Sequence, residues 1–202
     1  MKIQGRDPDE ADISLMVKDF IPTQEASLPK YSTLLPGSVE AVNVLRKDLN
    51  MKLGCTTAYS STMVKILIRE AKKQGLELDA AVARDDVLHG SKPRPFMLYK
   101  NLDLLDVWPI QAVVKVDDLA SGIGEAIQAG CWGVGVARYS RNMKIHSLED
   151  EAKLSKEEIE KKLEASRDIL WKAGAHYVID TVAELPEVCR EINARMKNGE
   201  AP

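Results

Sequence analysis

The chain has 202 residues, of which 45% are hydrophobic and 29% are charged, and its net charge at pH 7 is −3. That length is enough for one sizeable core. The two charge signs are interspersed, which argues against a nucleic-acid-binding or membrane-binding surface, and no apolar run approaches the length needed to span a bilayer. We therefore expect no nucleic-acid partner, no membrane partner, and a small-molecule ligand.

The cysteine pattern indicates a reducing compartment. Cys55, Cys131 and Cys189 are an odd number without a CxxC pair, and the first two lie inside apolar runs. Such cysteines are typical of reduced thiols in a protein core, and they support neither a disulfide framework nor a zinc site. A cytoplasmic location is the corresponding expectation.

The N-terminal part of the chain differs from the rest. Residues 8–20 place apolar side chains at helical spacing directly after Asp7 and Pro8, which predicts a helix with Asp7 as N-cap and Pro8 as its first residue. A proline-punctuated stretch follows from Pro22 to Pro36. We expect the helix to end there.

From Gly37 onward helical and strand-like segments alternate, with Gly75 and Gly130 as stop signals. A capping box from Ser155 to Glu158 predicts a long amphipathic helix in the highly charged segment 147–174. The rhythm predicts an α/β fold, a Rossmann-like parallel sheet with helices on both faces. The predicted strands are 51–56, 79–83, 112–117, 132–137 and one early in 176–192, and the predicted helices are 38–49, 61–74, 95–106, 121–129, one in 147–174 and a terminal one.

Two adjacent carboxylates, Asp117 and Asp118, end the apolar run AVVKVDD (112–118). Aspartates at a strand end often cap the next helix, and Asp118 or Ser121 could do so here. The small-residue turn that follows, LASGIG (119–124), would let the backbone approach a bound ion closely. This context favours a hard-cation site over a simple cap.

Hydroxyl groups end the first predicted strand. Thr56 and Thr57 could cap the helix that begins near Ser60 or donate to a bound oxyanion, and the motif alone favours neither. Tyr59 follows two positions later, where it could line the same cleft or simply pack in the turn. Ligands bind at this edge of open parallel sheets, so an oxyanion site is consistent with the topology.

Basic residues follow the second predicted strand. Lys92 stands before Pro93, and Arg94 is a rival for the same anion-binding role. A loop lysine is usually just solvated, so this motif is weak alone. The order of Thr, Lys and Asp-Asp at three successive strand-to-helix junctions makes the set specific for a phosphoryl group and a metal ion.

These motifs resemble one family along nearly the whole chain. The segments GCTTAYSSTM (54–63), DDVLHGSKPRPFM (85–97), VVKVDDLASGIGEAIQAGCWGVGVARYSRN (113–142) and GAHYVIDTVAELPEV (174–188) resemble phosphonoacetaldehyde hydrolase, of the haloacid dehalogenase superfamily. The resemblance implies Mg²⁺-dependent cleavage of a carbon–phosphorus bond to acetaldehyde and phosphate. In that family a cap lysine forms a Schiff base with the aldehyde and a nucleophilic aspartate takes the phosphoryl group.

The resemblance also implies roles for individual residues. Thr57 would bind the phosphonyl oxygens, and Lys92 would replace the basic residue that the family uses there. Asp118 would ligate Mg²⁺, with Asp117 supporting it. The ligand would then be a small phosphonate or phosphate.

The departures from the family concern the N-terminal side. The family begins with a strand ending in a DxAGT-like loop that holds the nucleophile, followed by cap helices that hold the Schiff-base lysine, and neither is in this sequence. Residues 1–36 resemble only a remnant of the helical cap, and residues 37–202 a core domain without its first strand. Ala58 also stands where the family usually has Gly.

The missing strand has a physical consequence, because in this fold it lies at the centre of the sheet. The strands 51–56 and 112–117 must then pair with each other or leave their inner edges unpaired. We expect the chain alone to be inactive, with a complementing N-terminal segment or a homodimer as candidate partners. A fragment, a remnant without activity, or one half of a split enzyme would explain it, in that order.

Two further functions compete with this hypothesis. One is a non-catalytic module that keeps the fold to bind a phosphorylated ligand or a partner chain. The other is a generic phosphatase of the same superfamily, which differs only in its substrate.

Overall fold

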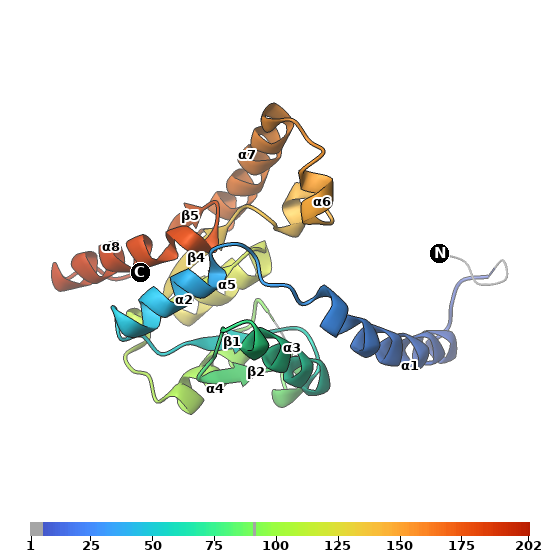
Figure 1. Cartoon of the computed structure of the whole chain (residues 1–202). Helices are drawn as coiled ribbons and strands as arrows, with labels where there is room; N and C mark the ends of the chain where they lie inside the picture. The colour runs from blue at the N-terminus through green and yellow to red at the C-terminus, as the bar shows by residue number, and fades with distance from the viewer. Residues whose placement is uncertain (1–5, 91) are drawn as a thin grey trace.

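The computed structural model describes residues 6–90 and 92–202, and it confirms the predicted α/β class. Helices alternate with short parallel strands from Ser38 onward (Figure 1). The strands are β1 (Gly54–Thr56), β2 (Ala80–Val82), β3 (Val114–Asp117), β4 (Trp132–Val136) and β5 (Tyr177–Ile179). The α-helices are α1 (Glu10–Ser27), α2 (Ser38–Lys47), α3 (Ser61–Lys73), α4 (Phe96–Leu105), α5 (Ala120–Ala129), α6 (Leu148–Glu151), α7 (Lys156–Lys172) and α8 (Leu185–Lys197).

The strands form two separate parallel sheets. β1 pairs with β2, with Cys55 opposite Ala81, and β3, β4 and β5 form a three-stranded sheet in that order. Within the described residues β1 and β3 do not pair with each other. Of the two outcomes predicted for these strands, the structure shows the one with unpaired inner edges.

The main core lies against the three-stranded sheet. Trp132 and Val134 of β4 are fully buried, and they form a cluster with side chains of α2 and α8 on one face of the sheet. A second cluster, which includes Leu163 and Leu170 of α7, covers the other face. A third cluster joins Leu98 of α4 to Ala126 and Ala129 of α5.

Local signals explain where several helices begin and end. Ser155 and Glu158 form the predicted capping box at the start of α7. Gly130 ends α5 with a φ of +78°, a conformation that glycine adopts without the strain a side chain would cause. Segment 147–174 is not one helix, because a separate short helix, α6, precedes the cap at Ser155.

The first helix differs from its prediction in two ways. Its N-cap is Asp9, which forms a capping box with Asp12, so the assignment of Asp7 was wrong. It also continues through Pro22 to Ser27, although a proline within a helix removes one intrahelical hydrogen bond. α1 has no buried residue and projects from the rest of the molecule (Figure 1). Residues 1–5 of the predicted cap remnant lie outside the described residues.

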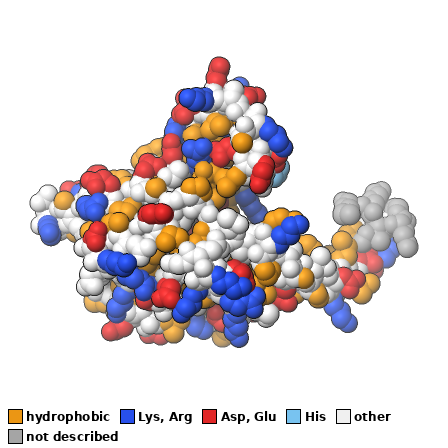
Figure 2. Space-filling view, in the orientation of Figure 1, with side chains coloured by type: hydrophobic (Ala, Val, Ile, Leu, Met, Phe, Trp, Pro, Cys, Tyr) orange, Lys and Arg blue, Asp and Glu red, His pale blue; other side chains and the backbone are white. Residues whose placement is uncertain are grey.

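The surface carries both charge signs, as the composition predicts. Figure 2 shows blue and red side chains interspersed over the face in view. No described helix combines the length and hydropathy that crossing a bilayer requires. The three cysteines are unpaired thiols, with Cys131 and Cys189 buried and Cys55 half-buried.

Candidate functional site

Asp117, the last residue of β3, lies between two lysines. Lys92 Nζ is 2.6 Å from its Oδ2, and Lys115 Nζ is 2.9 Å from the same oxygen. Lys92 belongs to the loop after β2 and Lys115 to β3 itself. The structure thus brings together two of the predicted site residues, Lys92 and Asp117, across the boundary between the two sheets.

The opposite charges of Asp117 and its neighbouring lysines each favour the charged form of the other. Burial raises the pKa of Asp117, but Lys115 and Lys92 together bring that pKa below its usual value. Burial lowers the pKa of Lys115, but Asp117 and Glu125 raise it above its usual value. Asp117 and Lys115 therefore both stay charged at neutral pH.

Gly122 makes room for the Asp117 carboxylate. A Cβ atom added to Gly122 would lie 1.8 Å from Asp117 Cγ, a distance that no real structure tolerates. The small-residue turn 119–124 was predicted to let the backbone approach a bound ion. In the structure, this close approach is made by the carboxylate of the chain's own Asp117.

Glu125 of α5 is a buried residue of the site that the sequence analysis did not identify. Its side chain is 0% exposed, and its Oε2 is 3.5 Å from Lys115 Nζ and 3.4 Å from Thr56 Oγ1. Its Oε1 has no hydrogen-bond partner among the described residues. Lys115 was missed as well. The sequence did offer a signal for each residue. Lys115 is a charged residue within an apolar strand, and Glu125 is the one acidic residue of its predicted helix.

Thr57, one residue after β1, has a hydroxyl that donates to no acceptor among the described residues. Its Oγ1 accepts a hydrogen bond from Tyr59 N at 3.2 Å, which leaves the hydroxyl proton for another acceptor. Ser60 caps α3 with its own side chain, so neither Thr56 nor Thr57 serves as the cap. The Tyr59 side chain is 38% exposed at the same turn.

The structure separates the two candidate anion-binding residues. Lys92 points to Asp117, whereas Arg94 Nη1 donates to the carbonyl oxygen of His89 at 3.2 Å on the exposed side of the loop. Ser91, which precedes Lys92, is not described. Of the two rivals, Lys92 is the one that faces the candidate site.

Of the carboxylates at this site, Asp118 is the one that forms no ion pair with a described residue. Burial and the neighbouring charge of Asp117 raise its pKa above the usual value. Its carbonyl oxygen accepts a hydrogen bond from Asn142 at 3.3 Å. The N-cap of α5 is Leu119, so neither Asp118 nor Ser121 caps that helix.

These carboxylates fit Mg²⁺ in part. The described residues contain no group of three or more acidic, histidine or cysteine side chains that could hold a metal ion. Asp117 forms ion pairs with two ammonium groups, whereas Asp118 forms none among the described residues, and burial and the charge of Asp117 raise its pKa, so a cation would stabilise its carboxylate. Asp118 therefore suits a metal ligand, and the remaining ligands would have to be water or substrate oxygens.

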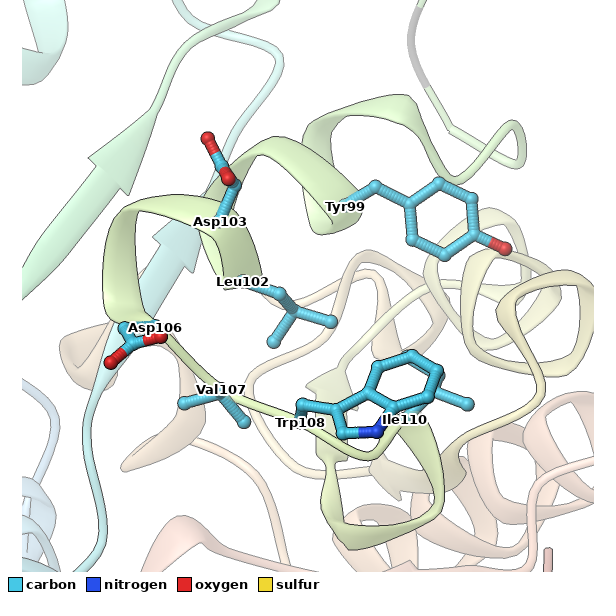
Figure 3. A pocket seen from close by; sticks show the side chains of 7 residues that line it. All are labelled: Tyr99, Leu102, Asp103, Asp106, Val107, Trp108 and Ile110. Carbon is cyan, nitrogen blue, oxygen red and sulfur yellow. The ribbon is translucent and has the colours of Figure 1, made fainter.

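A shallow cavity of about 310 Å³ lies elsewhere, beside α4 and the segment that follows it (Figure 3). None of the predicted site residues lines it. Trp108 stands at its edge with 86% of its surface exposed. Its lining residues are Tyr99, Leu102, Asp103, Asp106, Val107, Trp108 and Ile110.

Comparison with known proteins gives consistent matches. The profile of the haloacid dehalogenase-like hydrolases matches residues 3–136. Phosphonoacetaldehyde hydrolase from Syntrophobacter fumaroxidans is 34% identical over 98% of this chain and 70% of its own length, and that from Klebsiella pneumoniae is 38% identical over 98% and 73%. The crystal structure of a phosphonoacetaldehyde hydrolase-like protein from Oleispira antarctica superimposes with a TM-score of 0.92 at 34% identity, over 99% of this chain and 71% of that one.

Proposed function

The chain is a phosphonoacetaldehyde hydrolase-like member of the haloacid dehalogenase-like hydrolase family, and from that premise we propose that it carries the phosphoryl-binding and metal-binding half of the hydrolase site. The observation that supports this most is the position of Lys92, whose Nζ lies 2.6 Å from Oδ2 of Asp117, the last residue of β3 and the neighbour of Asp118 in the chain. The ligand is a small phosphonate or phosphate.

The charge balance explains why anion and metal would bind together. Lys92 and Lys115 are balanced by Asp117 and Glu125, and Asp118 adds one further negative charge. A phosphoryl dianion would therefore enter a site without excess positive charge. Mg²⁺ on Asp118 would reverse that balance, and it would supply Lewis-acid stabilisation of the phosphoryl oxygens.

The chain's own residues bind and orient the ligand. Thr57 donates its free hydroxyl proton to a phosphoryl oxygen, and Lys92 exchanges its contact with Asp117 for one with a second oxygen. Lys115 remains on Asp117 and keeps that carboxylate compensated while Lys92 is engaged. Mg²⁺ binds weakly without the anion, because Asp118 is its one uncompensated carboxylate.

The chain by itself does not hydrolyse phosphonoacetaldehyde under this proposal. The sequence offers neither the nucleophilic aspartate nor the Schiff-base lysine that the resemblance calls for. Loss of a covalent nucleophile costs orders of magnitude in rate. Mg²⁺-dependent release of phosphate by the purified chain, abolished by Asp118→Ala, would contradict this part of the proposal.

Calorimetric titration of inorganic phosphate, with and without Mg²⁺, tests the binding itself. We expect each ligand to strengthen binding of the other, since the coupling of two ligands is reciprocal. Lys92→Gln should weaken phosphate binding about tenfold or more, because a hydrogen bond to a charged group contributes about 1.5–3 kcal/mol. Arg94→Gln is the matched control and should leave it unchanged. Equal effects of the two variants would refute the assignment of Lys92.

A further inference from the structure

The shallow cavity beside α4 is separate from the proposed phosphoryl site. Its lining comes from α4 and from the segment between α4 and β3. Lys92 precedes the N-terminal end of α4, whereas the cavity lies chiefly at the C-terminal end, and the ten residues of that helix span roughly 15 Å. A ligand of the cavity would therefore bind apart from the phosphoryl group.

The apolar part of the cavity is held in place by the core. Leu102, Val107 and Ile110 line it, and the same three side chains pack against the buried cluster that joins α4 to α5. Two backbone turns fix the segment that carries them. Val107 N donates to Leu102 O at 3.1 Å, and Val113 N donates to Ile110 O at 3.0 Å. The apolar surface is therefore formed before any ligand binds.

Two exposed aromatic rings border this apolar surface. Trp108 has 86% of its surface exposed and Tyr99 has 44%. Figure 3 shows the Leu102 side chain directed toward the indole ring of Trp108, with the Tyr99 ring to one side. Tryptophan is highly buried on average, and an exposed apolar patch often marks a ligand-binding surface. The exposure of Trp108 therefore calls for a ligand that covers it.

The cavity also carries negative charge. Asp103 and Asp106 line it, both are exposed, and neither forms an ion pair with a described residue. They lie at the C-terminal end of α4, where the helix dipole is already negative and where the last turn has no basic residue. The charge that would complement this end of the helix is positive.

The neighbouring lysines bind backbone oxygens rather than these carboxylates. Lys52 Nζ donates to the carbonyl oxygens of Leu105 at 2.5 Å and Asp106 at 3.2 Å. Lys100 of α4 donates to the carbonyl oxygen of Asp86 at 2.7 Å. Lys52 thus compensates the end of the helix in part, and the two carboxylates of the cavity outnumber it.

We propose that this cavity binds a small organic cation, which has an ammonium or guanidinium group on a short apolar body. The ring face of Trp108 would contact the cationic group, because the quadrupole of an indole attracts a cation. Asp103 and Asp106 would supply the opposite charge, and the apolar side chains of the cavity would contact the body of the ligand. Nothing in this proposal depends on the phosphoryl site.

The size of the cavity favours a small ligand over a protein partner. Its volume of about 310 Å³ is at the lower end of the range for small-molecule sites. Seven residues line it, whereas a stable protein interface uses about 20–30 residues on each side. A second copy of the chain is therefore the competing occupant that the experiment must exclude.

Choline and its neutral isostere 3,3-dimethylbutan-1-ol are the probes, because they have the same shape and differ in charge. Each is titrated into the full chain, and NMR follows the indole N–H signal of Trp108 and the amide signals of residues 99–110. We expect choline to bind with a Kd in the millimolar range and the isostere to bind about fivefold more weakly. Added salt should weaken the binding of choline and leave that of the isostere unchanged.

A matched pair of tryptophan variants tests the aromatic contact. Trp108→Leu keeps an apolar side chain but removes the ring face, so it should weaken choline binding about fivefold and change isostere binding less than twofold. Trp171→Leu is the control, because Trp171 is 52% exposed on α7 and does not line the cavity. Both side chains are exposed, so we expect both variants to fold.

Removal of single charges tests the carboxylates. Asp103→Asn and Asp106→Asn should each weaken choline binding about two- to threefold and leave isostere binding unchanged. Asparagine also suits position 106, because it tolerates the left-handed conformation that Asp106 adopts with a φ of +51°. Glu164→Gln, which removes an exposed carboxylate of α7, is the control and should change neither.

Three results would overturn the proposal: no shift of the Trp108 signal by choline, equal affinities for choline and the isostere, and equal effects of Trp108→Leu and Trp171→Leu. Self-association of the chain in sedimentation, abolished by Trp108→Leu, would also overturn it, because a second copy would then cover the cavity. Phosphate binding should be unchanged in Trp108→Leu and choline binding unchanged in Lys92→Gln, so this proposal and the proposed function can fail separately.

Discussion

The two sheets of this molecule differ in the interactions that stabilise them. The three-stranded sheet has a fully buried central strand, β4, and apolar clusters on both faces. The two-stranded sheet has three-residue strands, of which Val82 alone is fully buried. Between them runs a seam of polar contacts, defined here as those of Thr56, Lys92, Lys115, Asp117 and Glu125. The hydrophobic effect therefore stabilises one half mainly by itself, while the other half depends also on charge pairing across the seam.

Of the changes considered, disruption of the seam should cause the largest loss of stability. In Gly122→Ala the new Cβ would overlap the Asp117 carboxylate and displace it from Lys92 and Lys115. Because disrupting a buried ion pair leaves uncompensated charges, we expect a loss of about 3 kcal/mol in the free energy of unfolding, measured by urea denaturation.

Gly124→Ala in the same helix is the control, since its Cβ would lie 3.1 Å from Pro93 Cβ and ask for only a small shift. We expect a change below about 1 kcal/mol there, because alanine also favours the helix. In an Asp117→Ala background Gly122→Ala should cost almost nothing more, since no carboxylate remains to be displaced. Equal losses in the two glycine variants would show that the seam is not what stabilises this region.

A matched pair of valines compares the two sheets directly. Val134 of β4 and Val82 of β2 are both 0% exposed, so replacing either with alanine removes the same buried area and should cost about 2 kcal/mol locally. Because no strand pairing within residues 6–90 and 92–202 joins the two sheets, Val82→Ala should speed amide exchange in β1 and β2 while β4 and β5 stay protected. Val134→Ala should speed amide exchange in both sheets. Identical exchange profiles would mean that the two sheets open as one unit.

The smallest expected change in stability is that caused by replacing Asp118, and its size should depend on pH. Its pKa in the folded state is raised above the unfolded value of about 3.9, so it favours folding only when protonated. That contribution is complete below the unfolded pKa and is lost as the pH rises through the folded pKa. Asp118→Asn should therefore increase stability at pH 7 by less than about 1 kcal/mol and change nothing near pH 3.

Asp117 should show the opposite sign. Its folded pKa is lowered, so its contribution is present above the unfolded pKa and is lost as the pH falls through the folded pKa. Asp117→Asn should destabilise the protein at pH 7, and the difference from the wild type should shrink on acidification. Chemical denaturation at several pH values measures both variants, and a common sign for the two would contradict the assigned charges.

Most of the fold was predictable because its signals are local. Periodicity located the alternating helices and strands from residue 37 onward, the box at Ser155 began α7, and Gly130 ended α5. Predictions failed where tertiary or competing local contacts decided the outcome. Asp9 capped α1 in place of Asp7 because Asp12 completes a capping box with it, and the helix continued through Pro22.

The sequence by itself determined the α/β class, the family resemblance and the set of polar residues at the strand ends, because periodicity, caps and motifs are written in neighbouring positions. The tertiary structure alone decided how these residues are paired. It placed Lys92 rather than Arg94 on Asp117, and it brought Lys115 and Glu125 into the group. It also left β1 and β3 apart. These outcomes depend on distances between residues far apart in the chain, and such distances are fixed only when helices and sheets pack around a common core.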